Sequence, residues 1–346
     1  MFENRDKTDI NELGEFGLIR MIQKAFPMDE ATTTVGIGDD GAVFPTLEGY
    51  QTVVSTDLLV ENVHFDLMYT PLKHLGYKAV VNGISDICAM NAVPTHLLLS
   101  LSFSSKFTLE AIEELYDGVR LACAKYKIDL IGGDTASSVK GLTLSVTAIG
   151  KIKETAIVRR SGAKPGDLLC VTGDLGGAYM GLQLLEREKR VFLEHPDMQP
   201  DLKNHDYIVG RQLKPEARVD VVDWLGKEGI VPTSMMDVSD GISSELFHLS
   251  EASDVSFAVH EEKLPIDQDT FNMAVEFGID ATTAALQGGE DFELLFTVDQ
   301  SAFESLKNHP DITVIGYVRE RSMKNQLISK GGNIFDLVAQ GWPAQS

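Results

Sequence analysis

The chain has 346 residues, 43% of them hydrophobic, which is enough for about two globular domains with substantial cores. Its formal net charge of −22 argues against nucleic acid and anionic membrane surfaces as partners, because like charges repel. The N-terminus has no apolar signal core and no apolar run reaches about 18 residues, so we expect a cytoplasmic protein without a membrane partner.

The first half of the sequence predicts alternating helices and strands. Residues 16–25 have the apolar spacing of a short amphipathic helix. Residues 76–91 predict a helix that is apolar on most sides and therefore buried. Thr108 is positioned to cap a further helix. Strands are expected at residues 96–103, 128–131 and 142–152.

The second half continues this pattern beyond residues 153–160, where we place a domain boundary because the polar turn 161–167 follows. Strands are expected at residues 168–172, 255–260, 292–298 and 312–318, and another strand that begins at residue 234 is expected to end in the two aspartates Asp237 and Asp240. Helices are expected from about 177 to 189, as a pair over 207–228, and at 243–253, 269–277 and 300–308, with an exposed loop at 191–206. The glycine cluster at 173–177 lacks the spacing of a dinucleotide fingerprint, so close helix packing is the favoured interpretation.

The three cysteines stand singly in apolar runs without the spacing of metal ligands. We therefore expect Cys88, Cys123 and Cys170 to be buried free thiols.

Aspartates beside Gly, Ser or Thr recur at five places, each at a predicted strand end or in the predicted buried helix. They are Asp39–Asp40, Thr56–Asp57, Asp86, Gly133–Asp134 and Asp237–Asp240. One such site would be ordinary turn chemistry, but five favour a shared acidic site. P-loop, nucleophile-elbow, zinc and EF-hand motifs are all missing from the sequence. This pattern indicates a site that holds several Mg²⁺ ions and handles a polyphosphate.

Seven motifs carry a resemblance to a known family: GIGDD, STD…VHF, NGISDICAM, LIGGD, RRSGAKPGD, DVSDG and GGEDFEL. In this order they resemble the thiamine-monophosphate kinase family, over about residues 14–342. The wider superfamily includes aminoimidazole ribonucleotide synthetase and selenophosphate synthetase. The resemblance implies an α/β fold with α+β-type mixed sheets and a two-domain, aminoimidazole ribonucleotide synthetase-like architecture. Its domains would be residues 1–155, which bind metal and ATP and dimerise, and residues 156–346.

The resemblance also implies roles for individual residues. The family's metal positions match Asp40, Ser55, Thr56, Asp57, Asp86, Asp134, Asp237 and Asp240. Its ATP positions match Tyr126, Gly133, Asp134, Arg160 and Ser239, and its substrate positions match His64, Glu290 and Trp342. The implied reaction uses ATP as co-substrate and several Mg²⁺ ions to convert thiamine monophosphate to thiamine diphosphate, by direct in-line transfer in a homodimer. No catalytic base is expected, because the acceptor phosphate is already largely dianionic.

Several alternatives stay open at this stage. Arg159 is an alternative to Arg160 as the nucleotide contact, and Trp342 stands where the family has a different aromatic segment, so it could instead pack on the core. The chain could also be another ATP-dependent member of the superfamily, or a non-catalytic Mg-nucleotide sensor. His64 and Glu290 favour an enzyme, because a sensor needs no acceptor pocket.

Overall fold

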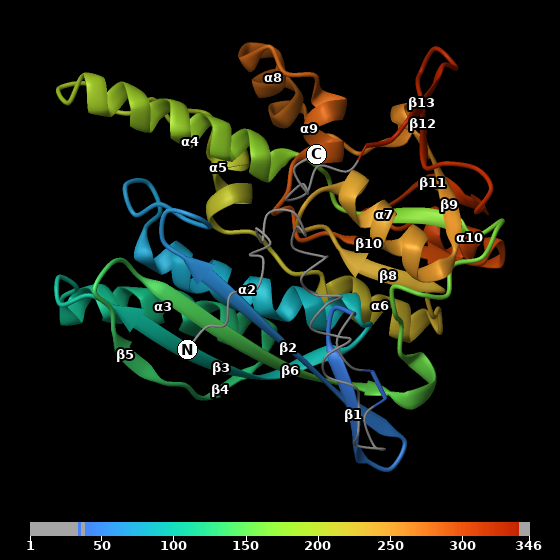
Figure 1. The fold of residues 1–346 in the computed structure, drawn as a ribbon, viewed down its shortest axis with the longest axis horizontal. Coiled ribbons are helices and arrows are strands. Elements are labelled where there is room, and N and C mark those ends of the chain that lie inside the picture. Colours follow the sequence, from blue (N-terminus) through green and yellow to red (C-terminus); the bar gives the residue numbers. More distant parts are fainter. Residues whose placement is uncertain (1–33, 36–38, 339–346) are drawn as a thin grey trace, which may run out of the picture.

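The structure is a computed structural model that describes residues 34–35 and 39–338. The predicted helix at 16–25 and Trp342 lie outside the described residues. Two mixed sheets with flanking helices confirm the α/β fold class. All six strands of one sheet precede residue 154 and all seven of the other follow residue 167 (Figure 1). The division into domains 1–155 and 156–346 stays a prediction.

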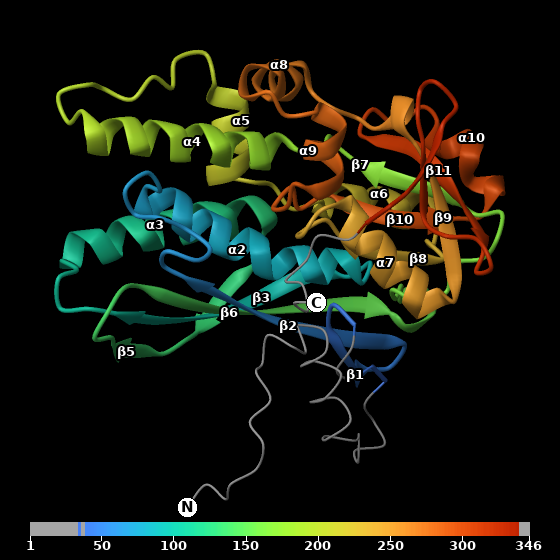
Figure 2. The same cartoon turned by 45° about the horizontal axis from the view of Figure 1, so that its top comes forward.

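The first sheet has the order β1-β2-β6-β3-β4, with β5 paired to β3. Its strands are β1 (Ala42–Leu47), β2 (Tyr50–Val60), β3 (Val93–Phe103), β4 (Asp129–Gly132), β5 (Thr135–Ser137) and β6 (Thr143–Lys153). Alternate residues of β6 are buried, which is the pattern of a sheet covered on one side. The covering helices are α2 (Leu72–Ala89) and α3 (Leu109–Tyr126), and none of the described helices covers the other face (Figure 2).

The second sheet has the order β13-β12-β9-β11-β7-β10-β8. Its strands are β7 (Leu168–Thr172), β8 (Ser234–Asp237), β9 (Val255–His260), β10 (Leu294–Val298), β11 (Ile312–Glu320), β12 (Gln326–Ile328) and β13 (Ile334–Asp336). Every residue of β8 and β10 is buried, because helices pack on both faces of the sheet. The helices of this half of the chain are α4 (Gly177–Glu194), α5 (Asp206–Leu213), α6 (Val219–Glu228), α7 (Ile242–Ser253), α8 (Gln268–Phe277), α9 (Ala281–Gln287) and α10 (Phe303–Leu306).

Most of the predicted elements are confirmed, although their observed bounds differ from the predicted ones by a few residues. The helix predicted at 76–91 is α2, and it is buried, as expected for an apolar helix. Thr108 caps α3 by accepting a hydrogen bond from the amide of Ala111 at 3.3 Å. The loop predicted at 191–206 is wrong in its first part, because α4 continues to Glu194. Strand β1 and the short elements β5, α9, β12 and β13 were not predicted.

The glycine cluster at 173–177 packs closely, as predicted. A side chain on Gly176 would lie 2.9 Å from the carbonyl carbon of Ala284, and Gly176 has a φ of +80°. The carboxylate of Asp291 accepts hydrogen bonds from the amides of Gly176 at 2.7 Å and Ala178 at 3.3 Å. The start of α4 is therefore occupied by a protein carboxylate rather than offered to a phosphate.

Two further expectations can be compared with the structure. All three cysteines are free thiols, and Cys88 and Cys170 are buried, but Cys123 is only half-buried. Among the described residues, no helix combines the length and apolar character needed to cross a membrane.

Candidate active site

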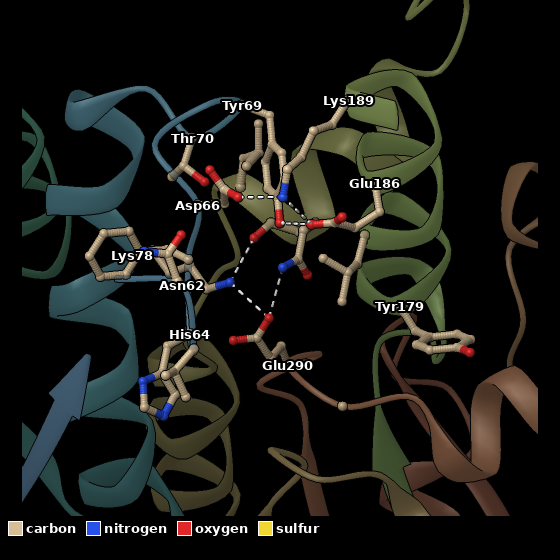
Figure 3. A pocket seen from close by; sticks show the side chains of 16 residues that line it. Asn62, His64, Asp66, Tyr69, Thr70, Lys78, Tyr179, Glu186, Lys189 and Glu290 are labelled. Atoms are coloured by element: carbon tan, nitrogen blue, oxygen red, sulfur yellow. Dashed lines mark hydrogen bonds and ion pairs between the residues drawn. The ribbon is translucent and has the colours of Figure 1, made fainter. Parts of the chain in front are cut away.

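A cavity of about 460 Å³ lies where α2, α4 and α5 meet the loop after β2 and the segment 288–293 (Figure 3). The predicted substrate residues His64 and Glu290 both line it, although they are far apart in sequence. Their convergence makes this cavity the candidate acceptor site.

His64 is held by its own turn. The amide of Val60 donates a hydrogen bond to His64 Nδ1 at 2.9 Å, and the amide of His64 donates to the carbonyl of Val60 at 2.9 Å. A ring nitrogen that accepts a hydrogen bond carries no proton, so the proton of the neutral ring is on Nε2. His64 therefore offers an N–H donor from a fixed ring.

Glu290 is held by two residues from different helices. Lys78 Nζ, from α2, lies 3.0 Å from Glu290 Oε2, and Gln212 Nε2, from α5, donates to the same oxygen at 2.8 Å. Lys78 also donates to the carbonyl of Gln212 at 2.9 Å. The side chain of Lys78 is 3% exposed, and a buried ammonium requires such partners.

The opposite wall of the cavity carries a second ion-pair network. Lys189 Nζ lies 2.5 Å from Asp66 Oδ2 and 3.5 Å from Glu186 Oε1. Tyr69 donates its hydroxyl proton to Glu186 at 2.8 Å. These contacts join the loop after β2 to α4 across the cavity.

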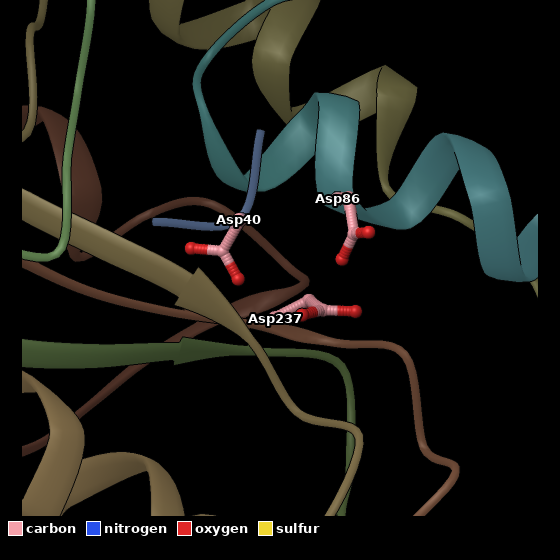
Figure 4. Close-up of side chains that lie close together, drawn as sticks. All are labelled: Asp40, Asp86 and Asp237. Carbon is pink, nitrogen blue, oxygen red and sulfur yellow. The ribbon is translucent and has the colours of Figure 1, made fainter. Parts of the chain in front are cut away.

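Three carboxylates form a compact cluster, shown in Figure 4. Asp40 comes from just before β1, Asp86 from α2 and Asp237 from the last position of β8. One oxygen from each lies within 4.8 Å of the others. Among the described residues, this is the group of acidic, His or Cys side chains that fits a metal ion. Its donors are all oxygens, which suits a hard cation such as Mg²⁺.

The cluster residues hold their protons more tightly than ordinary carboxyl groups. Burial, followed by the charge of Asp40, raises the pKa of Asp237 to about 7. Burial and the charge of Asp237 raise the pKa of Asp86 well above its usual range. Asp57, inside β2, faces the same group, and burial together with Asp40 raises its pKa to about 6. Asp57 Oδ2 is also buried without a hydrogen-bond partner. A cation at this place would relieve both the repulsion and the unpaired oxygen, so the residues fit a metal site.

Two serines fix the orientation of these carboxylates. Ser55 donates its hydroxyl proton to Asp86 Oδ2, and Ser85 donates to Asp237 Oδ2 at 2.6 Å. Ser55 was a predicted site residue, whereas Ser85, inside the NGISDICAM motif, was missed. Because Ser85 precedes Asp86 in α2, this helix contributes both a carboxylate and the hydrogen bond that holds another carboxylate.

Arg160 pairs with the cluster through Asp40. Its Nε and one terminal nitrogen lie 2.9 and 2.6 Å from the two oxygens of Asp40. Although burial disfavours its charged form, Asp40 and its other acidic neighbours raise the pKa of Arg160 overall. The side chain of Arg159 is exposed. The geometry thus favours Arg160 as the functional arginine of the pair.

The DVSDG segment joins the cluster to the cavity. Ser239 and Asp240 follow Asp237, and their amides donate to Glu245 Oε1 at 3.0 and 2.8 Å. The carbonyl of Ser239 accepts from the amide of Glu290 at 2.8 Å. Burial raises the pKa of Asp240, and the charge of Arg160 opposes this shift. Ser239 and Asp240 therefore lie between the two parts of the site, and their roles toward ATP and metal stay predictions.

The structure does not bring four of the predicted residues to the cluster. The hydroxyl of Thr56 donates to the carbonyl of Val146 at 3.0 Å and is exposed on the sheet face opposite α2. Tyr126 donates to Glu216 at 2.5 Å and lines a separate cavity of about 380 Å³. Gly133 and Asp134 follow β4, which is the edge strand of the sheet next to β3, and both residues are exposed.

The pairing of the strands shows how far Gly133 lies from Asp57. Asp57 is paired with Val146, and Val146 with Leu99. A Cβ on Gly133 would lie 1.8 Å from the carbonyl oxygen of Leu99, so Gly133 lies against the third strand of this row. Three strand spacings of about 4.8 Å place Gly133 roughly 14 Å from Asp57. A metal contact of Asp134 is therefore not seen in the structure and stays a prediction.

Comparison with known proteins identifies the family of the chain. Residues 38–152 match the family model described as AIR synthase related protein, N-terminal domain. The chain is 39% identical to the thiamine-monophosphate kinase of Bacillus subtilis over 325 residues, which cover 92% of this chain and 95% of that protein. It is 34% identical to the thiamine-monophosphate kinase of Aquifex aeolicus, over 90% of this chain and 93% of that protein.

A solved structure of AaThiL complexed with AMPPCP and TMP has the same fold. It superposes with a TM-score of 0.81 at 30% identity and covers 98% of this chain and 99% of that one. Fold and site thus define an enzyme of the AIR synthase-like superfamily. Within it, the chain belongs to the thiamine-monophosphate kinase family, whose members are phosphotransferases.

Proposed function

We propose that the chain transfers the γ-phosphoryl group of ATP to thiamine monophosphate and releases ADP and thiamine diphosphate. The observation that carries this proposal is the junction of an acidic cluster with a cavity that contains His64 and Glu290. The complex of AaThiL with AMPPCP and TMP supports the same two substrates.

Mg²⁺ is the cation that best fits the cluster, where Asp40, Asp86 and Asp237 would hold it with help from Asp57. When bound, it would neutralise the repulsion between two phosphate groups. We infer that more than one ion binds. Four carboxylates face one another here, and a fifth, Asp240, follows Asp237 in the DVSDG segment. Ser55 and Ser85 keep the carboxylates oriented.

The remaining chemistry follows from the acceptor. The second pKa of a phosphate monoester is near 6, so the acceptor is largely dianionic at pH 7 and needs no base. An acceptor oxygen attacks the γ-phosphorus in line with the bond to ADP; that bond breaks and ADP leaves with the electron pair. His64 contributes an N–H donor and Glu290 an acceptor oxygen within the cavity, and no protein group becomes phosphorylated.

We further propose that the chain forms a homodimer through the uncovered face of the first sheet. Leu58 on β2 and Ile131 on β4 are 56% and 55% exposed. Apolar side chains gathered on an open sheet face are typical of protein interfaces. The cytoplasmic location stays a prediction.

Phosphorus NMR of the protein with ATP, MgCl₂ and thiamine monophosphate tests the reaction. We expect thiamine diphosphate and ADP in equal amounts. ADP without thiamine diphosphate would indicate another acceptor and hence another branch of the superfamily. Nucleotide binding without any turnover would indicate a sensor.

A further inference from the structure

The carboxylate of Glu290 is held through one of its two oxygens. Lys78 and Gln212, which are 3% and 5% exposed, converge on its Oε2 from α2 and α5. No described donor is hydrogen-bonded to Oε1, the oxygen without a dashed line in Figure 3. We call Lys78, Gln212 and Glu290 the Glu290 triad.

The backbone of Glu290 is constrained as well. Its φ is +64°, an unusual value for a residue with a side chain, and its amide donates to the carbonyl of Ser239 at 2.8 Å. A Cβ on the preceding Gly289 would lie 2.3 Å from that same carbonyl oxygen, so the two segments are in close contact. Such a backbone persists only where its surroundings hold it, which is typical of functional sites.

Two adjacent residues of α5, Arg211 and Gln212, contact different carboxylates of segment 290–293. Gln212 holds Glu290, while Arg211 lies 3.6 Å from Asp291 and 3.0 Å from Glu293. Asp291 and Glu293 are fully buried, whereas Glu290 is 30% exposed and is the carboxylate of this segment that lines the cavity. The buried pairs hold the segment in place, and Glu290 is left to meet a ligand.

We propose that Lys78 and Gln212 are positioning residues, which fix Glu290 so that its Oε1 binds the cationic, N–H-bearing ring portion of the acceptor. This inference rests on the proposed function, because it takes thiamine monophosphate as the acceptor. The ring portion is the fitting partner, because an ionised carboxylate accepts hydrogen bonds and attracts positive charge. A phosphate dianion beside Glu290 would be repelled, and two of the three Lys78 protons are already given to Glu290 and Gln212.

Calorimetry with two ligands tests the proposal. Thiamine has the rings without the phosphate, so thiamine and thiamine monophosphate separate ring binding from phosphate binding. Each of Glu290→Gln, Lys78→Met and Gln212→Met should weaken binding of both ligands by the same factor, about tenfold for a charge-assisted hydrogen bond. Affinity for a non-hydrolysable ATP analogue should not change, and acceptor KM should rise more than kcat falls.

Coupling between the variants tests the positioning role. If Lys78 acts through Glu290, Lys78→Met combined with Glu290→Gln should lose no more affinity than Glu290→Gln alone. Lys189 is the matched control, since it lines the same cavity but pairs with Asp66 and Glu186. The losses from Lys189→Met and Glu290→Gln should therefore add. Melting curves identify misfolded variants, and Gln212→Met, which keeps the side-chain length, provides the test if Lys78→Met does not fold.

Three outcomes are distinguishable. Equal, non-additive losses for both ligands support the Glu290 triad. A loss confined to thiamine monophosphate would overturn the inference, because Lys78 would then contact the phosphate. If the unmodified protein binds neither ligand, the proposed function itself fails.

Discussion

Arg160 and Asp40 form a two-bonded ion pair at the centre of the site, with distances of 2.9 and 2.6 Å. The side chain of Asp40 is 1% exposed and that of Arg160 is 21% exposed. The charge of Arg160 also counteracts the raised pKa values of Asp39, Asp237 and Asp240. A residue expected to contact nucleotide phosphates therefore also balances the charge of the acidic cluster.

This relationship predicts that Arg160→Met destabilises the metal-free protein. Asp40 would lose its bidentate partner and become an unpaired buried charge, at a cost of about 3–5 kcal/mol. Urea unfolding in the presence of EDTA measures the change. Arg159→Met is the control, and because its side chain is exposed it should shift stability by no more than about 0.5 kcal/mol. A larger effect at Arg159 would reverse the assignment.

The carboxylate cluster predicts a separation between activity and stability. Asp57→Asn, Asp86→Asn and Asp237→Asn should each lower kcat at least about 100-fold, since each removes a charge that would hold the metal. None should unfold the protein, because Asn preserves the shape and removes mutual repulsion. Product assays and melting curves in EDTA measure both effects. Asp197→Asn, in an exposed loop, serves as the control and should match the unmodified protein. Near-normal turnover in all three would show that the cluster has no catalytic function.

The same carboxylates predict how metal-free stability depends on pH. The folded protein holds protons on Asp57 and Asp237 up to pKa values of about 6 and 7, whereas the unfolded chain releases them near 3.8. A group that binds its proton more tightly in the folded state stabilises it at low pH, so this contribution declines as pH rises from about 4 to 7. In EDTA, the melting temperature should fall by roughly 5 °C between pH 5 and 7.5, and less in Asp57→Asn. A rise over this range would contradict the prediction.

The fixed ring of His64 predicts a selective defect. His64→Ala should raise the KM for thiamine monophosphate about tenfold, since one hydrogen-bond donor is lost, and should leave MgATP affinity unchanged. Steady-state kinetics with each substrate varied in turn measure the two effects. Equal losses for both substrates would mean that the acceptor and nucleotide sides of the site are assigned wrongly.

The open sheet face predicts the effect of Leu58→Asp on assembly. A charge on a buried interface costs several kcal/mol, so the variant should sediment as a monomer under conditions where the unmodified protein is a dimer. Val139→Asp is the control, because this side chain is 97% exposed and lies in the connection between β5 and β6. Identical sedimentation of Leu58→Asp and the unmodified protein would exclude this face as the interface.

Much of the fold could be predicted from sequence because the main elements have clear periodicity. Helix α2 is apolar on most sides and β6 alternates strictly, so both were expected close to their observed bounds. The strands β12 and β13 have three residues each, too few to show a period. Asp57 was expected at a strand end, but it lies inside β2, because this strand continues through it to Val60.

Only those site residues that stand in recognisable motifs could be predicted from the sequence. Asp40, Asp86 and Asp237 stand in glycine- or serine-bearing motifs, and the structure brings them together. Lys78 gave a weaker signal, as a lysine in an otherwise apolar helix eight residues before Asp86. Gln212 gave none, because a glutamine in a polar helix is ordinary until its contact with Glu290 is seen. The position of Asp134 depends on strand pairing across the sheet, which local sequence does not specify.

Helix α2 carries Lys78 near the acceptor cavity and Asp86 in the cluster, eight residues or about 12 Å apart along its axis. A continuous helix cannot shorten, so the two binding regions keep a constant span. An acceptor whose rings are anchored by Glu290 must then be long enough for its terminal oxygen to reach the γ-phosphate. Thiamine monophosphate would have the necessary length, while thiamine ends one phosphate short. We therefore expect thiamine to bind as a competitive inhibitor without being phosphorylated, so that molecular length distinguishes thiamine monophosphate from thiamine.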